Sequence, residues 1–419
     1  MSTYERHVLD NGLRVLTAPV PQAASVTCMV MLAAGSRYET ADTNGIAHFS
    51  EHMFFKGTHR RPSARDIAGE IDALGGEFNA FTGKEYTAYY VKCAAEHRDI
   101  ALDVIVDMLR NSLFDAEEIE REKGVIVEEM NMYFDTPRDY IGGVYEELLY
   151  GDQPLGWDIV GRKETVRGAS RETFMSYLDS WYHPSRMVLG VGGNVGENLL
   201  ERAEELLGDL PGRETGAPAP TAPHLNGRVK VFTKPSDQAH IILGVPSYPL
   251  AHPDRYALQV LSNVLGGGMS SRLFTEVRER RGLAYYVFGM NHSYTDAGSL
   301  YAQAGVDINR IDEAVTTIRD ELRRIADESV PSDELEKTKS FARGRLVLQL
   351  ESPQGLILFG LRREVLEQQA PDLEEVLDGI AAVTADDVQR VARDLIADET
   401  LRLAVIGPFD DAERFEALL

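Results

Sequence analysis

A segment rich in proline and glycine divides this chain near its middle. Residues 208–228 read GDLPGRETGAPAPTAPHLNGR, a composition that buries little apolar surface and favours an extended connection. Because 419 residues exceed the usual length of one domain, we expect two domains of similar size. The sequence therefore predicts an N-terminal domain at residues 1–210, a linker at 211–227 and a C-terminal domain at 228–419.

The two halves carry similar patterns in the same order, which indicates an internal repeat. Each half opens on two apolar strands, continues with a helix, and closes on an amphipathic helix followed by another strand. The paired segments are 15–19 with 231–235, 27–33 with 241–246, the helices from about 45 and from about 253, and 187–195 with 400–406. Strands and helices do not alternate strictly. The predicted fold is therefore α+β, with two structurally related domains, each an antiparallel-rich sheet with helices packed on one face.

Apolar residues at helical spacing predict three further helices, at 116–134, 310–328 and 332–350. We expect Asp115 to cap the first of these helices at its N-terminus. Pro331 is expected at the first turn of the last one.

The charge of the chain limits the partners that its surface suits. Lysine and arginine number 43 against 67 aspartate and glutamate residues, so the formal net charge is −24. A surface this acidic is a poor match for nucleic acid or for an anionic membrane. Cationic ligands and basic peptides stay open as partners, although acidity alone more often serves solubility.

The cysteines and the N-terminus bear on the cellular compartment. Cys28 and Cys93 lie in apolar stretches, and two cysteines cannot form a disulfide framework in a chain this long, so buried free thiols are predicted. The first residues lack the basic and apolar regions of a secretory signal, and no window approaches the ~18–20 apolar residues of a membrane span. The sequence predicts a soluble, cytoplasmic protein.

The stretch 45–58, GIAHFSEHMFFKGT, indicates a metal site. On a helix, His48 and His52 lie one turn apart on the same face, and this spacing suits a tetrahedral divalent ion, above all zinc. Glu51 lies beside that face, close enough to reach water at the metal without being a ligand. This H-x-x-E-H pattern is typical of the inverzincins, and it favours a metal hydrolase over two incidental surface histidines.

A catalytic zinc site needs a third protein ligand. The helix predicted at 116–134 offers acidic candidates, namely Glu117, Glu118, Glu120, Glu122, Glu128 and Glu129. Glu122 and Glu129 are seven residues apart and share a face, whereas Glu128 points about 100° away from Glu129. Acidic residues on helices usually face solvent, so the pattern by itself leaves the third ligand open.

Three stretches of the sequence together resemble a known family. GIAHFSEHMFFKGT is followed by EFNAFTGKEYTAYY at 77–90 and by EREKGVIVEEM at 120–130. This series resembles the pitrilysin/insulinase family of zinc metallopeptidases. The likeness is closest to the branch of mitochondrial processing peptidase β subunits and their bacterial relatives, and it covers nearly the whole chain.

The resemblance assigns the metal ligands. It implies one zinc ion per chain, held by His48, His52 and Glu129. It also implies that Glu122 supports the ligands from behind, as carboxylates near metal sites commonly do. Glu128 stays an alternative to Glu129, because the family spacing varies by one residue.

The resemblance also assigns roles outside the metal cluster. Asn79 and Ala80 match the family's edge strand, to which the resemblance implies that a peptide substrate adds as a further strand. The plainer interpretation of Asn79 is a polar residue at a strand end. The second half has no H-x-x-E-H. There, Arg278 and Tyr285 match a pair that reaches the substrate carbonyl, where a cation and a phenol would stabilise an oxyanion. Their spacing alone favours an ion-paired arginine and a strand aromatic. The glycines at 266–268 are interpreted as a flexible turn.

These features predict a zinc-dependent endopeptidase in which Glu51 activates water at the metal. Larger family members close four such domains as a clamshell around a peptide, and this chain has two. The resemblance therefore implies a homodimer, or a heterodimer with a related inactive subunit, in which Arg278 and Tyr285 come from the same chain or from its partner. The expected substrates are peptides or unfolded segments, with basic peptides favoured by the net charge. Two alternatives stay open. The chain is a catalytic subunit that needs a non-catalytic partner, or it is an inactive scaffold subunit.

Overall fold

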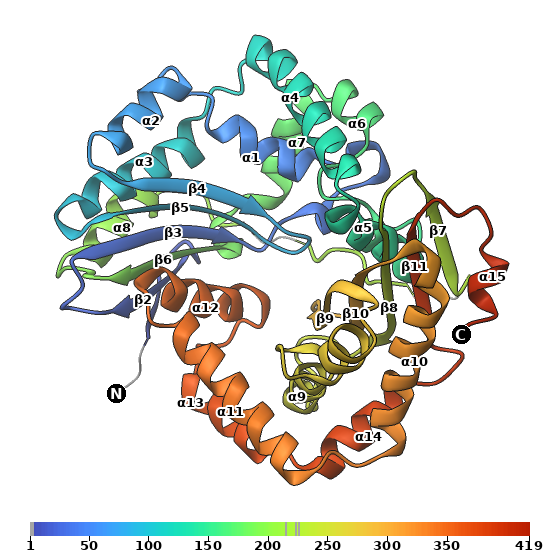
Figure 1. Ribbon diagram of the computed structural model, residues 1–419. Helices are drawn as coiled ribbons and strands as arrows, with labels where there is room; N and C mark the ends of the chain where they lie inside the picture. Colours follow the sequence, from blue (N-terminus) through green and yellow to red (C-terminus); the bar gives the residue numbers. More distant parts are fainter. Residues whose placement is uncertain (1–3, 214–215, 223, 225–226) are drawn as a thin grey trace. The chain divides into compact units, whose positions relative to one another are not determined.

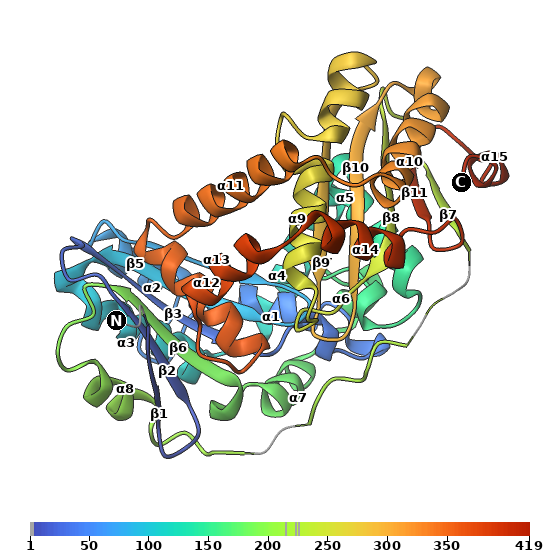
Figure 2. The ribbon, with the colours of Figure 1, turned by 90° about the horizontal axis from the view of Figure 1, so that it is seen from below.

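The computed structural model describes residues 4–213, 216–222, 224 and 227–419 (Figures 1 and 2). The rest of the predicted linker, residues 214–215, 223 and 225–226, lies outside the described residues. The chain forms two compact units, which we call the first and the second unit. The first unit comprises Met1–Asn131, Trp157–Ala219 and Val347–Leu373, and the second comprises Met132–Gly156, Pro220–Leu346 and Glu374–Leu419.

The first unit holds the following elements. Its strands are β1 Glu5–Val8, β2 Arg14–Pro19, β3 Ser25–Leu32, β4 Glu77–Thr82, β5 Thr87–Ala94 and β6 Met187–Gly193. Its helices are α1 Ile46–Phe54, α2 Ala64–Asp72, α3 Arg98–Asn111, most of α4 Ala116–Asp135, α6 Lys163–Gly168, α7 Arg171–Trp181, α8 Leu199–Leu207 and α12 Pro353–Leu366.

The second unit holds the remaining elements. Its strands are β7 Val229–Thr233, β8 Ala239–Ser247, β9 Ala284–Ser293, β10 Gly298–Val306 and β11 Arg402–Gly407. Its helices are α5 Pro137–Tyr150, α9 Arg255–Gly266, α10 Ile311–Asp327, most of α11 Ser332–Gln349, α13 Leu373–Ala382, α14 Ala385–Leu395 and α15 Glu413–Glu416.

The sheet of the first unit has the strand order β1-β2-β6-β3-β5-β4. β2 and β6 run parallel, and the other neighbouring strands are antiparallel. Successive side chains of each strand point to opposite faces of the sheet. Both faces of this sheet are apolar, and each packs against a hydrophobic core. In β3, Val26, Cys28 and Val30 face the core that includes α1 and α3, whereas Met29 and Met31 face α12 (Figure 1).

The sheet of the second unit repeats this topology. Its strand order is β7-β11-β8-β10-β9, with β7 and β11 parallel and the other neighbours antiparallel. This order corresponds strand by strand to β2-β6-β3-β5-β4, and α9, α10, α11 and α12 follow in the sequence as α1, α3, α4 and α5 do. The predicted fold class, two related α+β sheets with packed helices, is confirmed.

Each sheet is covered on its second face by a helix from the other half of the sequence. α12 packs against β6, β3 and β2, and α5 packs against β11, β8 and β7. The prediction of helices on one face only therefore missed one helix in each unit. The compact units also differ from the predicted domains 1–210 and 228–419 by these exchanged segments. The sequence signal for a helix on the second face is a strand in which apolar and polar residues do not alternate. β3, with the sequence SVTCMVML, is such a strand and is buried on both faces.

A glycine and a buried ion pair seat α12 on the first sheet. A Cβ at Gly190 in β6 would lie only 2.5 Å from Cδ1 of Leu361, so a larger residue there would push the helix away. Glu364 of α12 is fully buried and accepts hydrogen bonds from Arg14 and Arg6 at 3.1 and 3.0 Å. Its charge is thus compensated where water is excluded.

Cys28 and Cys93 are buried free cysteines, as predicted. Burial raises the pKa of the Cys93 thiol to about 11, which keeps it in its less reactive protonated form. Within the described ranges, the structure has no helix that combines the length and the apolar character needed to cross a membrane.

Candidate metal centre

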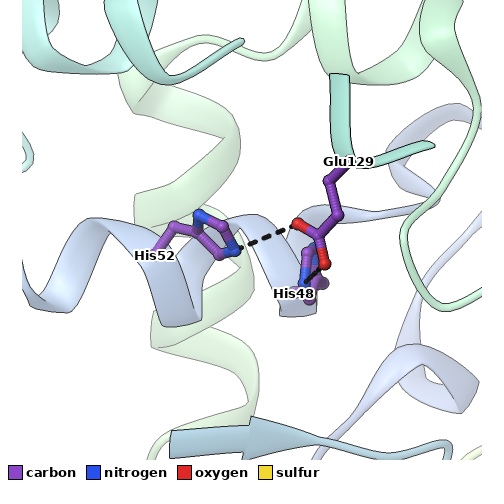
Figure 3. Close-up of side chains that lie close together, drawn as sticks. All are labelled: His48, His52 and Glu129. Atoms are coloured by element: carbon purple, nitrogen blue, oxygen red, sulfur yellow. Dashed lines mark ion pairs between the residues drawn. The ribbon is translucent and has the colours of Figure 1, made fainter. Parts of the chain in front are cut away.

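Helix α1 presents His48 and His52 on one face, and Glu129 of α4 approaches both of them (Figure 3). The imidazole rings lie with their centroids 4.7 Å apart. Oε1 of Glu129 is 3.6 Å from Nε2 of His48, and Oε2 is 3.5 Å from Nε2 of His52. The carboxylate therefore meets both ring nitrogens on the side away from the helix axis.

The donor set fits a zinc ion. One ligand atom from each of the three residues lies within 4.8 Å of the others, and among the described residues this is the group that could hold a metal ion. Two ligands at about 2.0–2.1 Å from a tetrahedral zinc ion lie about 3.3 Å apart, close to the observed nitrogen–oxygen separations. Two imidazoles with one carboxylate is also a ligand set typical of catalytic zinc.

Glu122 lies behind His52, about two turns before Glu129 on α4. Its Oε1 is 2.8 Å from Nδ1 of His52, and its Oε2 is 2.5 Å from Nζ of Lys56. A hydrogen bond from Nδ1–H to Glu122 leaves the lone pair of Nε2 pointing at the candidate metal position. The contact with Glu122 thus restrains the orientation of the His52 ring.

The charges at the site favour a bound cation. Burial of the His52 ring opposes protonation, but Glu122 and Glu129 outweigh it and raise the pKa of His52 to about 9. Contact with His48 and then with His52 holds the pKa of Glu129 well below its usual range. In the metal-free protein, a proton on His52 therefore supplies positive charge that a divalent ion would replace.

Replacing Glu122 by glutamine is expected to weaken zinc binding about 10- to 100-fold, because His52 loses its charged hydrogen-bond acceptor. Competition with a chromophoric chelator measures this affinity. Glu120→Gln is the matched control, since it makes the same charge change on the same helix but lies at an exposed position. An unchanged affinity in Glu122→Gln would contradict the orienting role.

The structure separates the two candidate third ligands on α4. Glu129 lies in the histidine cluster, whereas Glu128 is exposed. Asp115 accepts a hydrogen bond from the backbone N–H of Glu117 at 2.9 Å and caps this helix, as predicted.

Glu51 lies on α1 between the two histidines in sequence and is half-buried. Its Oε2 accepts a hydrogen bond of 2.5 Å from the hydroxyl of Thr82 at the end of β4. Asn79 and Ala80 lie in the same strand, which pairs with β5 on one side and forms the edge of the sheet on the other. Oδ1 of Asn79 accepts from the backbone N–H of Ala80 at 2.9 Å, so the Asn79 amide runs along this strand.

Sequence reasoning missed the residue that holds the start of α1. Glu39 is buried, and its carboxylate accepts hydrogen bonds from the backbone N–H of Gly45 and of Ala47, each at 2.8 Å. Gly45 precedes the helix with a φ of 98° and has no side chain to cap it. Glu39 therefore satisfies N–H groups of the first turn that leads to His48. The only sequence signal was an acidic residue seven positions before a helix that lacks an ordinary cap.

Replacing Glu39 by alanine should lower the free energy of unfolding by about 2–4 kcal/mol, because buried N–H groups lose their acceptor. Urea-induced unfolding measures this change. Glu39→Gln keeps one carbonyl acceptor and is expected to fall between alanine and the wild type. A loss smaller than about 0.5 kcal/mol in Glu39→Ala would show that the contact is dispensable.

The sequence of the chain matches the models of one known protein family. Residues 14–161 match the model described as insulinase (peptidase family M16), and residues 168–341 match the model described as peptidase M16 inactive domain. An uncharacterized zinc protease of Bacillus subtilis is 38% identical over 406 residues, which cover 96% of this chain and 98% of that protein. The chain belongs to the insulinase family, M16.

Other similar proteins match this chain over nearly its whole length. An uncharacterized zinc protease of Streptomyces coelicolor is 36% identical over 421 residues, 99% of this chain and 91% of that protein. The crystal structure of a protease from Helicobacter pylori covers 97% of this chain and 100% of its own, with a TM-score of 0.90 at 23% identity. A Pseudomonas fluorescens structure titled peptidase M16 inactive domain covers 98% and 99%, with a TM-score of 0.89 at 18% identity. At these identities, the two structures show a shared M16 fold. The branch within the family stays a prediction.

Arg278 and Tyr285 lie in the part of this M16 chain that matches the inactive-domain model. Arg278 belongs to the π-helical segment Phe274–Arg280, and Tyr285 belongs to β9. The guanidinium carbon of Arg278 lies 5.8 Å from the centroid of the Tyr285 ring, and that tyrosine is 73% exposed. The structure thus brings the two residues together within the second unit, and their role toward a substrate stays a prediction.

Proposed function

We propose that this M16 chain is a zinc-dependent endopeptidase that cleaves peptides or unfolded segments. The observation that carries the proposal is the convergence of His48, His52 and Glu129 on one position, with Glu51 on the same helix as the histidines. A zinc ion held there would supply a Lewis acid for the peptide carbonyl and for water. The names of the relatives as zinc proteases support the same chemistry.

Glu51 is the general base in this proposal. Its Oε2 is held by Thr82, and its Oε1 has no hydrogen-bond partner among the described residues. Oε1 is therefore available to accept the proton of the attacking water and to pass it to the leaving amine. Glu122 keeps the His52 ring turned so that Nε2 faces the metal position.

Strand β4 is the proposed substrate strand. It forms an edge of the sheet, and an extended peptide can add to such an edge through main-chain hydrogen bonds. Asn79 and Ala80 would contact the peptide backbone there. Binding of this kind selects extended chains, which fits peptides or unfolded segments better than folded proteins.

The assembly is proposed as a homodimer whose partner chain supplies Arg278 and Tyr285 to the reaction. Both residues are present in this chain, so one kind of chain holds all the proposed groups. A heterodimer with a related inactive subunit is the second candidate, and it is favoured if the purified chain binds zinc but cleaves nothing. Three further points stay predictions. They are a preference for basic peptides, the binding of one zinc ion per chain, and a cytoplasmic location.

The test is cleavage of an unstructured peptide by the purified chain, followed by mass spectrometry. The proposal expects cuts at internal bonds, loss of cleavage with a zinc chelator, and no cleavage by a Glu51→Gln preparation, which controls for contaminating proteases. A matched neutral peptide, with its basic residues replaced, measures the effect of substrate charge. Cleavage that the chelator leaves intact would contradict the proposal.

A further inference from the structure

We infer that Thr82 is a positioning residue that holds the carboxylate of Glu51 in its working orientation and links it to strand β4. The inference rests on the proposed function, because it concerns the orientation of the general base. The contact itself is a hydrogen bond of 2.5 Å from the Thr82 hydroxyl to Oε2 of Glu51.

Thr82 reaches Glu51 because of its place in the pleat of β4. Side chains at alternate positions of a strand share a face. Ala80 lies in the same core cluster as the buried residues of α1, and Phe78 packs against Phe55 just after that helix, with ring centroids 5.6 Å apart. Thr82 is the next residue of this series, so its hydroxyl also points to the α1 side.

The backbone at Thr82 is held firmly by the hairpin that follows it. Thr82 pairs with Thr87 in β5, and the N–H of Gly83 donates to the carbonyl of Tyr86 at 2.8 Å. The tip of this hairpin, the turn between β4 and β5, is also bonded to the segment at Ser36. The N–H of Ser36 donates to the carbonyl of Gly83 at 3.1 Å. The hydroxyl of Thr82 is therefore a fixed point on the sheet.

A second contact holds the same tip. The buried side chains of Arg37 and Glu85 form an ion pair at 2.5 Å. The N–H of Arg37 also donates to the carbonyl of Lys84 at 2.8 Å. The hairpin that carries Thr82 thus has two anchors besides its own strand pairing.

A glutamate on a helix has several rotamers, and a general base must present one oxygen to the reacting water. Thr82 occupies Oε2 and so restricts the rotation of the carboxylate, which leaves Oε1 as the oxygen that can meet the water. Because Thr82 belongs to the proposed substrate strand, this contact also fixes the distance between that strand and the base. A group held in place before the reaction contributes to the rate without a further loss of entropy.

The first test compares Thr82→Val with Thr82→Ser in the full-length protein. Valine keeps the shape of threonine but has no hydroxyl, and serine keeps the hydroxyl. We expect Thr82→Val to lower kcat about 10- to 100-fold while KM and zinc content change less than about twofold. Thr82→Ser is expected to recover most of this loss.

A matched control removes a hydroxyl on the neighbouring strand. Thr87 donates to the carbonyl of Ala34 at 2.9 Å, so Thr87→Val disturbs the same hairpin at another bond. We expect it to lower stability without the selective fall in kcat. Equal kcat values for Thr82→Val and the wild type, or equal losses in Thr82→Val and Thr82→Ser, would overturn the inference.

The second test needs no activity, since it measures the thermal midpoint of the zinc-free protein in a double-mutant cycle. Thr82→Val is expected to lower the midpoint by about 2–4 °C in the wild type and by much less in a Glu51→Ala background, because the partner is already absent. Equal shifts in both backgrounds would overturn the contact. A wild-type protein that shows the coupling but cleaves no peptide would instead refute the proposed function.

Discussion

Replacing Glu51 by glutamine should reduce kcat for peptide cleavage about 10²- to 10⁴-fold while the zinc content stays unchanged. Glutamine has nearly the same shape, but it cannot take a proton from water, and general-base catalysis contributes about that factor. Glu51 does not belong to the group of residues that converge on the metal position, so its charge is not needed to hold the ion. Steady-state kinetics and metal analysis of the same preparation measure both quantities.

The Glu51→Asp variant, which has a shorter side chain with the same charge, distinguishes a role as general base from a general effect of charge. Glu51→Asp keeps the charge but withdraws the oxygens by one methylene, and it should retain activity between those of the wild type and Glu51→Gln. Full turnover in Glu51→Gln would reject the base assignment. Loss of zinc from Glu51→Gln would also reject it, since it would make Glu51 part of the metal site.

Replacing Glu129 by glutamine should abolish zinc binding at micromolar concentrations, and cleavage with it. The Glu129 carboxylate carries the negative charge that faces His48 and His52, and contacts with these histidines hold its pKa well below the usual range. A neutral amide offers a weaker oxygen ligand and removes the charge that attracts the cation. We expect the zinc dissociation constant to rise by more than about 100-fold, beyond the effect of a residue that only orients a ligand.

Glu128→Gln is the matched control for this change. The two glutamates are neighbours on α4, so both variants lose one charge from the same helix, but Glu128 is exposed. Zinc affinity should therefore stay within about twofold of the wild type in Glu128→Gln. The reverse result, with zinc lost in Glu128→Gln and kept in Glu129→Gln, would make Glu128 the ligand and contradict the geometry.

The two histidines of the candidate metal centre could be predicted from the sequence because their spacing is local. Helical periodicity was sufficient to predict that His48 and His52 share a face. Predicting Glu129 required a second helix and the resemblance to the family. Thr82 and Glu39 could not be found in this way. Thr82 contacts Glu51 from 31 positions further along the chain, and Glu39 reaches the start of α1 across a loop. A threonine at a strand end and a glutamate in a loop are too common to indicate such contacts.

The fold was predictable in its repeat and less so in its packing. Strands and helices follow one another in corresponding order in the two halves of the sequence, as the predicted repeat requires, because local periodicity determines which segments become strands or helices. The exchange of α5 and α12 depends on which apolar helix covers which sheet face, a long-range choice that periodicity does not encode. Gly190 and Gly192 in β6 mark where α12 approaches the sheet, but glycine in a strand has several explanations.

The repeat also clarifies why the candidate metal ligands lie in one unit. α9 follows β8 as α1 follows β3, and its inward positions hold Ala257, Val260 and Leu261, all of them buried. These side chains fill a core and offer no metal ligand. The second unit thus keeps the scaffold of the repeat without the histidines of α1.

The most direct measurement of the central claim is a zinc titration of the chelator-treated protein, with cleavage of an unstructured peptide recorded at each addition. The proposed site predicts that cleavage is absent without zinc, rises in proportion to added zinc, and levels off at about one equivalent per chain. Cleavage by the zinc-free protein, or zinc bound with equal affinity by Glu129→Gln and the wild type, would contradict it.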